Sequence, residues 1–137
     1  NQTAGTLGTS SERIKVFNST ATSTWTLSIA ATGGESSLWQ STGDSYDYNG
    51  TQSEGRLEVD PSLATITPSG GCSNTGITAQ TAQYFVNGSV SSINLVIAGA
   101  SAETNCAWYI EDIDLTQDIP ASQSPGEYSI GMTITVI

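Results

Sequence analysis

The residues best suited to chemistry form an acidic run late in the chain: Glu111, Asp112 and Asp114, with Asp118 close behind. Carboxylate oxygens are hard ligands, so closely spaced acids of this kind can coordinate Ca²⁺. Two such carboxylates can also serve as the acid and base of a glycosidase. The interpretation that we favour is structural, because charged side chains on a solvated sheet edge discourage aggregation. Calcium is the only cofactor that the sequence suggests.

Other catalytic constellations have little basis in this composition. Histidine is absent, which removes the commonest general base and rules out a Ser-His-Asp triad. Lys15 is the only lysine, and it lies in the pattern Arg13-Ile14-Lys15-Val16, where both charges point to one face of a strand. That pattern is typical of a solvated face rather than of a Schiff-base lysine. We therefore expect a protein that is not an enzyme.

Aromatic residues raise the question of carbohydrate binding, because flat rings stack on sugars. Trp25 and Trp108 fall on apolar strand positions and are predicted to be core residues. Trp39, Tyr46 and Tyr48 lie in a polar segment and are the candidate exposed platform. Burial of these three rings in the core is the alternative, and the more common one.

Two cysteines, Cys72 and Cys106, lack the CxxC spacing of a zinc or redox site. Their strand-like surroundings predict a disulfide, which is typical of exported proteins. Two buried free thiols in a cytosolic protein are the alternative. Four asparagines begin Asn-x-Ser/Thr sequons and are candidate glycosylation sites: Asn1, Asn18, Asn49 and Asn87.

The charge of the chain limits its partners. Three Lys and Arg residues stand against 13 Asp and Glu residues, for a net charge of −10. Such a surface repels phosphate backbones and anionic lipid headgroups, so nucleic acid is an unlikely partner. No apolar run approaches the roughly 20 residues needed to span a bilayer, and no membrane insertion is expected. The remaining candidate partners are copies of the chain itself and cell-wall or other glycans.

Alternating apolar residues predict strands along most of the chain. The clearest is the final run, in which Tyr128, Ile130, Met132, Ile134 and Val136 alternate with small polar residues. Runs of the same kind begin near Trp25, Leu57, Ile93 and Cys106. The apolar phase switches near Glu111-Asp112, which predicts a bulge or a strand change there. The predicted core comprises Trp25, Leu27, Ile93, Leu95, Ile97, Trp108, Ile110, Tyr128, Ile130, Met132, Ile134 and Val136.

About eight short strands without an amphipathic helix predict an all-β fold, a β-sandwich with Greek-key-like connections of the immunoglobulin or jelly-roll kind. Residues 13–137 are expected to form this single domain. Residues 1–12 are polar and read as an arm that could be exchanged with a neighbouring subunit by strand addition. In that arrangement Ala4 and Leu7 would fill small pockets.

Trp25-Thr26-Leu27 and the segment from Tyr128 to Val136 resemble the Trp-x-Leu (WxL) surface domains of Gram-positive bacteria. That family carries a later Tyr-xxx-Leu-Thr-Trp-Thr-Leu strand, where this chain has Met132, Ile134 and Val136 at the Leu, Trp and Leu positions. The ending also resembles closing strands of pilus-like surface proteins. The resemblance implies a secreted β-sandwich at the cell surface, and two functions then come first. One is the self-assembling subunit of an extracellular filament, and the other is a carbohydrate-binding or cell-wall-binding module.

Overall fold

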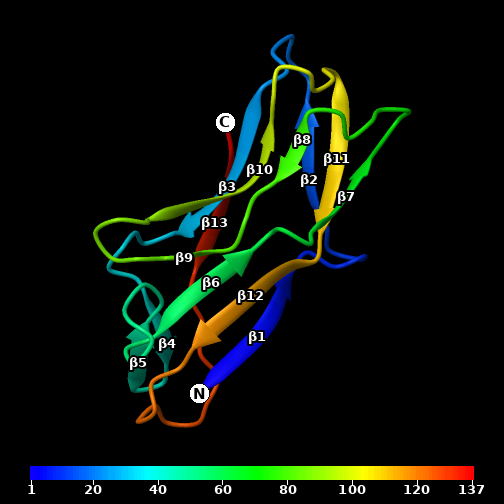
Figure 1. Ribbon diagram of the computed structural model, residues 1–137. Helices are drawn as coiled ribbons and strands as arrows, with labels where there is room; N and C mark the ends of the chain where they lie inside the picture. Colours follow the sequence, from blue (N-terminus) through cyan, green and yellow to red (C-terminus); the bar gives the residue numbers. More distant parts are fainter.

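The structure, a computed structural model, describes all of residues 1–137 and contains thirteen β-strands and no helix (Figure 1). In chain order the strands are β1 (Gln2–Leu7), β2 (Ile14–Asn18), β3 (Trp25–Ala31), β4 (Leu38–Ser41), β5 (Asp44–Asp47), β6 (Arg56–Asp60), β7 (Thr65–Pro68), β8 (Ile77–Ala79), β9 (Gln83–Tyr84), β10 (Ser92–Ala98), β11 (Cys106–Glu111), β12 (Ile113–Asp118) and β13 (Met132–Val136). The predicted all-β class is confirmed.

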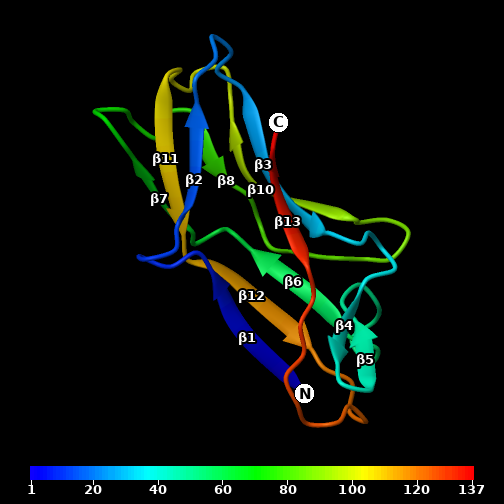
Figure 2. The same cartoon turned by 180° about the vertical axis from the view of Figure 1, so that it is seen from behind.

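The strands form two facing layers (Figures 1 and 2). One layer is the antiparallel sheet β13-β3-β10-β8. The other is built from two sheets placed end to end, β1-β12-β6-β9 and β2-β11-β7. A small hairpin of β4 and β5 lies beside the lower sheet. The first and last strands pair with partners distant in the chain, β1 with β12 and β13 with β3.

The second layer is bent because its strands are interrupted at one level. Asp112 separates β11 from β12 in the left-handed conformation, with φ of 62°, and its N–H donates to the carbonyl of Gly8 at 3.0 Å. The residue is an aspartate, a type that tolerates this conformation better than most. The predicted strand change near Glu111-Asp112 is confirmed. Thirteen strands are observed where about eight were predicted, in part because residues of the predicted arm form β1.

The core lies between the layers and continues from the upper half to Leu57 and Val59 of β6 and Ile113 of β12 in the lower sheet. Trp25, Leu27 and Ile29 of β3 alternate inward and face Trp108 and Ile110 of β11. The rings of Trp25 and Trp108 lie 5.5 Å apart, and the indole N–H of Trp108 donates to the carbonyl of Ser73 at 3.0 Å. The burial of Trp25, Leu27, Trp108 and Ile110, with that of Ile93 and Leu95, confirms this part of the predicted core; Ile29 is a core residue that was not in the predicted list.

Two parts of the predicted core are wrong. Ile97 is only half-buried, because β10 shifts register against β3 between Asn94 and Val96, so that Leu95 and Val96 both turn inward. Ile134 and Val136 are 38 % and 45 % exposed. The other three predicted core residues of this stretch, Tyr128, Ile130 and Met132, are half-buried.

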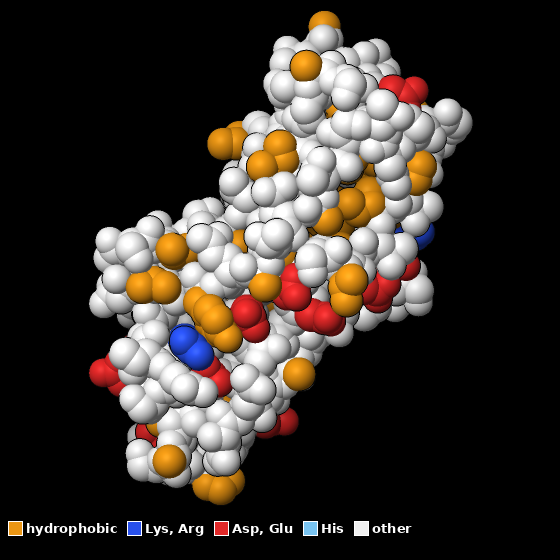
Figure 3. Space-filling view, in the orientation of Figure 1, with side chains coloured by type: hydrophobic (Ala, Val, Ile, Leu, Met, Phe, Trp, Pro, Cys, Tyr) orange, Lys and Arg blue, Asp and Glu red, His pale blue; other side chains and the backbone are white.

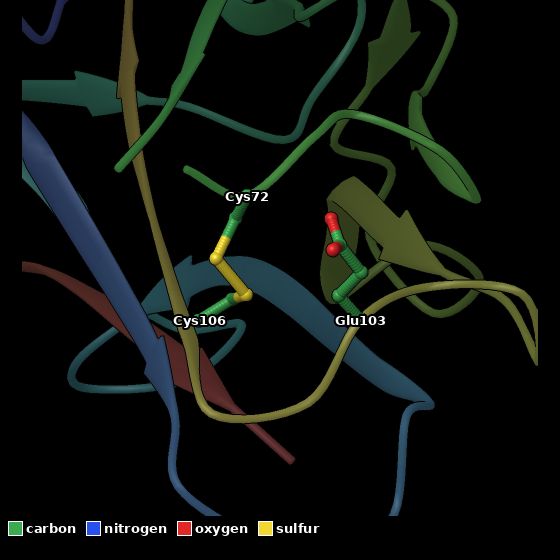
Figure 4. Close-up of side chains that lie close together, drawn as sticks. All are labelled: Cys72, Glu103 and Cys106. Carbon is green, nitrogen blue, oxygen red and sulfur yellow. A yellow bond between two sulfur atoms is a disulfide. The ribbon is translucent and has the colours of Figure 1, made fainter. Parts of the chain in front are cut away.

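The predicted disulfide is confirmed. Cys72, in the loop after β7, is bonded to Cys106 at the start of β11, with Cα atoms 6.1 Å apart (Figure 4). The bond links a strand to the loop that follows its neighbour. No free cysteine is present.

Candidate functional site

The most distinctive surface is an open seam along one side of the sandwich, defined here as the free edge of β13 with the groove between β13 and β1. Within β13, Met132, Ile134 and Val136 lie opposite Ala31, Ile29 and Leu27 of β3, all three of which are buried. The β13 side chains therefore point to the inner side of their sheet. Ile134 and Val136 are nevertheless exposed, since the opposite layer does not extend over them.

A largely apolar cavity of about 240 Å³ opens along this seam. Its walls come from both layers, with Ile29, Ile130 and Met132 on one side and Ala4 and Leu115 on the other. Trp39 also lines the cavity, and its indole N–H donates to the side-chain oxygen of Gln117 at 2.8 Å. The side chains of Trp39 and Gln117 are thus engaged with each other, and most of the lining is apolar.

The seam is open because β1 covers it poorly. Thr3, Gly5 and Leu7 pair with Gln117, Leu115 and Ile113, whose side chains lie on the inner side of β12. At Gly5 a Cβ atom would meet nothing within 4 Å, so the space beside Leu115 is empty. Gly5 is the signal in the sequence that could have revealed the seam, because a glycine within a strand supplies no side chain to cover the apolar residue opposite it.

The N-terminal arm is ordered by its own domain. Residues 2–7 form β1, which pairs with β12 of the same chain over six residue pairs. Ala4 lines the cavity and Leu7 packs against the core. The order of the arm therefore requires no neighbouring subunit, and exchange of the arm between subunits stays a prediction.

The acidic run predicted as a calcium site does not converge on one point. Asp112 accepts a hydrogen bond from the Thr65 hydroxyl at 2.7 Å, and Asp118 pairs with the Arg56 Nε at 2.7 Å. Glu111 lies 4.0 Å from the Nε of Arg13. The side chains leave β11 and β12 in different directions because Asp112 reverses the alternation.

Asp114, the remaining member of that run, pairs in register with Asp60 on the neighbouring strand β6. The only close group of three potential ligand residues in the protein is Cys72, Glu103 and Cys106, drawn in Figure 4. Its two sulfurs are bonded to each other and offer no thiolate ligand. Glu103 accepts hydrogen bonds from the backbone N–H and hydroxyl of Ser73, and these bonds lower the pKa of its carboxyl.

The aromatic platform prediction is corrected by burial. Tyr48 is completely buried against Phe85, with ring centroids 5.1 Å apart, and Tyr46 is 8 % exposed. Burial raises the pKa of both tyrosine hydroxyls. Trp39 stacks on Tyr46 at 6.2 Å and is half-buried. These rings brace the β4–β5 hairpin against the sandwich, so they do not form a flat exposed surface for a sugar.

The four sequons divide into two groups. The side-chain amides of Asn18 and Asn49 are buried and donate to the carbonyls of Thr22 and Glu35, at 2.8 Å and 3.0 Å. Those nitrogens are not accessible for glycosylation in the folded protein. Asn1 and Asn87 are exposed and remain candidate sites.

Charge is distributed away from the seam. All three cations lie over tyrosine rings: Arg13 and Lys15 over Tyr109, and Arg56 over Tyr84. Figure 3 shows acidic side chains gathered in a band across the face that carries β6 and β12. The last charged side chain in the sequence is Glu127, so β13 and the segment leading into it are uncharged.

No protein family, curated protein or solved structure matches the chain. The resemblance to WxL and pilus-like surface proteins therefore stays a prediction. Because the structure contains only strands, it offers no helix that could span a membrane.

Proposed function

We propose that this chain is a non-enzymatic structural module of the extracellular cell surface, which associates with copies of itself through the open seam and serves as the subunit of a filament. The observation that carries the proposal is the unprotected apolar edge of β13. Proteins normally protect such edges with charged residues, prolines, bulges or short strands, because exposed edges pair with other chains.

Four other edge strands, β8, β9, β7 and β2, carry this protection. Strands β8 and β9 have three and two residues, and β7 ends at Pro68. The edge strand β2 carries Lys15. In contrast, β13 has five residues, none of them charged or proline, and presents Ile134 and Val136 to solvent. Exposed apolar area gains about 25 cal/mol for each Å² removed from water, so this edge favours association.

A filament requires a second contact on each subunit, since one self-complementary contact closes into a dimer. The edge of β1 is a second free edge without charge, on the other side of the seam. Two open edges on one module are compatible with continued assembly. The disulfide supports an oxidising, extracellular setting.

The arrangement of the carboxylates supports a non-enzymatic role. Asp118 is held by Arg56, Asp112 by Thr65, and the cavity at the seam is lined by apolar side chains. No pair of acidic groups flanks that cavity, so a substrate in it would meet no acid and base.

The test is the particle size of the protein against concentration, by sedimentation velocity and electron microscopy. Ile134→Lys places a charge on the seam, and Leu63→Lys is the matched control, because Leu63 is 77 % exposed and lies in the β6–β7 connection, away from the seam. We expect association of the native chain, weakened at least about ten-fold by I134K, since an uncompensated charge would be buried. L63K should associate as the native chain does.

Two results would contradict the proposal. One is a native chain that stays monomeric at millimolar concentration. The other is equal weakening by L63K and I134K, which would show that general surface hydrophobicity, and not the seam, drives association. Circular dichroism of each variant checks that the fold is retained, as expected for side chains that are already exposed.

A further inference from the structure

We infer that β13 pairs with β13 of a second copy, antiparallel and about a two-fold axis that passes through Ile134. This inference rests on the proposed self-association and specifies one of its contacts. It follows from the hydrogen-bonding pattern of β13, the placement of its apolar side chains and the absence of charge along it.

The backbone pattern shows which groups of β13 are free. Ile137 and Thr26 exchange both of their hydrogen bonds, at 2.8 Å and 3.1 Å, and Gly131 accepts from the N–H of Thr32 at 2.9 Å. In an antiparallel pair the residues bonded to the partner alternate. The odd-numbered residues therefore bond to β3, while Met132, Ile134 and Val136 direct their N–H and C=O groups to the free edge.

These free groups are self-complementary. With the axis at Ile134, that residue faces its own copy, and Met132 faces Val136 of the second copy on either side. Each of these three pairs can exchange two hydrogen bonds, so every free group of β13 finds a partner. Moving the axis to Met132 places Ile130 opposite Ile134, and Ile130 lies outside the strand. The axis at Ile134 thus gives the most complete pairing.

The side chains agree with this register. Met132, Ile134 and Val136 share one face of the strand, so the pairing joins two apolar stripes into one that runs over both seams. It also joins the two four-stranded sheets into one continuous sheet.

Charge favours a second copy over a charged partner. The chain has a net charge of −10, but it carries no charged side chain from Tyr128 to Ile137. At this edge two copies can therefore approach without placing carboxylates opposite one another. A partner strand with a lysine or aspartate facing Ile134 would bury that charge without a counterion.

The test is site-directed cross-linking of the full chain. Because the native protein has no free cysteine, Ile134→Cys introduces a single thiol. In the inferred register the two Cα atoms at this position lie about 5.5 Å apart, within the range for a disulfide. The control is Thr135→Cys, whose copies would lie diagonally apart, on the opposite face of the strand. We expect I134C to cross-link at least about ten-fold faster than T135C under mild oxidation.

Mixtures of variants distinguish the alternatives. Met132→Cys mixed with Val136→Cys should give the heterodimer, which fixes the antiparallel register. Cross-linking of I134C preferentially to Ala4→Cys would identify β1 of the second copy as the partner and overturn this inference, leaving the proposed function intact. This inference would also be overturned, with the proposed function intact, if the variants associate in sedimentation but I134C and T135C cross-link at equal rates. Absence of any association at millimolar concentration would overturn both proposals.

Discussion

A larger side chain on β1 that occupies the cavity at the seam should stabilise the fold. Gly5→Val introduces such a side chain. Gly5 lies in β1 with ordinary strand backbone, opposite Leu115, and a Cβ there meets nothing within 4 Å. The residue lines the apolar cavity of about 240 Å³, so a branched side chain has room to enter it. Valine also suits a strand better than glycine does.

The magnitude combines two contributions. Where the backbone is compatible, replacing glycine by a residue with a Cβ stabilises the fold by about 0.4–1 kcal/mol, because it reduces the conformational entropy of the unfolded chain. Each buried methyl group adds up to about 0.8 kcal/mol, reduced here because the seam is open to water. We expect G5V to raise the free energy of unfolding by about 1–2 kcal/mol. For a domain of this size each kcal/mol corresponds to about 3–5 °C in Tm.

Chemical denaturation followed by tryptophan fluorescence measures the change, and Gly34→Val is the matched control. Gly34 also has nothing within 4 Å of an added Cβ, but its φ is +79°, so valine there is strained. G34V should lower the free energy of unfolding by about 1–3 kcal/mol. A G5V variant that is unchanged or less stable than the native protein would refute the reasoning, because the cavity beside Leu115 would then not be empty space available to β1.

Three further changes test other parts of the structure. Removing the disulfide with Cys72→Ala and Cys106→Ala should cost about 3–4 kcal/mol in chemical denaturation, from the loop of 34 residues that it closes, and a loss below about 1 kcal/mol would contradict that reasoning. The Asp118 side chain is 5 % exposed and pairs with Arg56, so Asp118→Asn should lower the free energy of unfolding by about 1.5–3 kcal/mol. An unchanged stability would show that the charge of Asp118 contributes nothing to this contact. Glu103 has a pKa below its ordinary 4.5 because Ser73 donates to its carboxylate, so its contribution is present above that value and is lost as the pH falls through the lowered pKa. Melting temperatures measured between pH 5 and pH 2 should therefore fall less steeply in Glu103→Gln, and parallel curves would argue against the role of that contact.

Alternation in the sequence predicts well which face of a strand a side chain lies on, but it predicts poorly whether another layer covers that face. The inward residues of β3 and β11 were predicted correctly because each strand alternates cleanly and faces another strand that does the same. The alternation of β13 also gives the right face, since Ile134 lies beside buried Ile29. Whether that face is buried depends on the opposite layer, and there β1 offers Thr3 and Gly5. No pattern within residues 128–136 carries that information.

Other differences arise from contacts distant in the chain. Tyr48 lies in a polar segment, and its burial depends on Phe85, which no local pattern connects with it. The bulge in β10 changes the phase at Val96 without a glycine or proline to mark it. The carboxylates from Glu111 to Asp118 are close in sequence, but the reversal at Asp112 and the partners Arg56 and Thr65 separate them.

The placement of the chain ends gives the module a mechanical property. Asn1 lies at the lower end of β1 and Ile137 at the upper end of β13 (Figures 1 and 2). A tensile force between them would pull β1 lengthwise past β12, and β13 lengthwise past β3, because each chain end lies at the outer end of its strand and is pulled away along that strand. Inter-strand hydrogen bonds that lie perpendicular to the force bear the load together and must break together. A strand that is pulled away sideways from one end loses its hydrogen bonds one at a time. Stretched between these two residues, the sandwich would therefore resist extension by shear, and its lifetime under load would follow the rate of unfolding rather than its equilibrium stability.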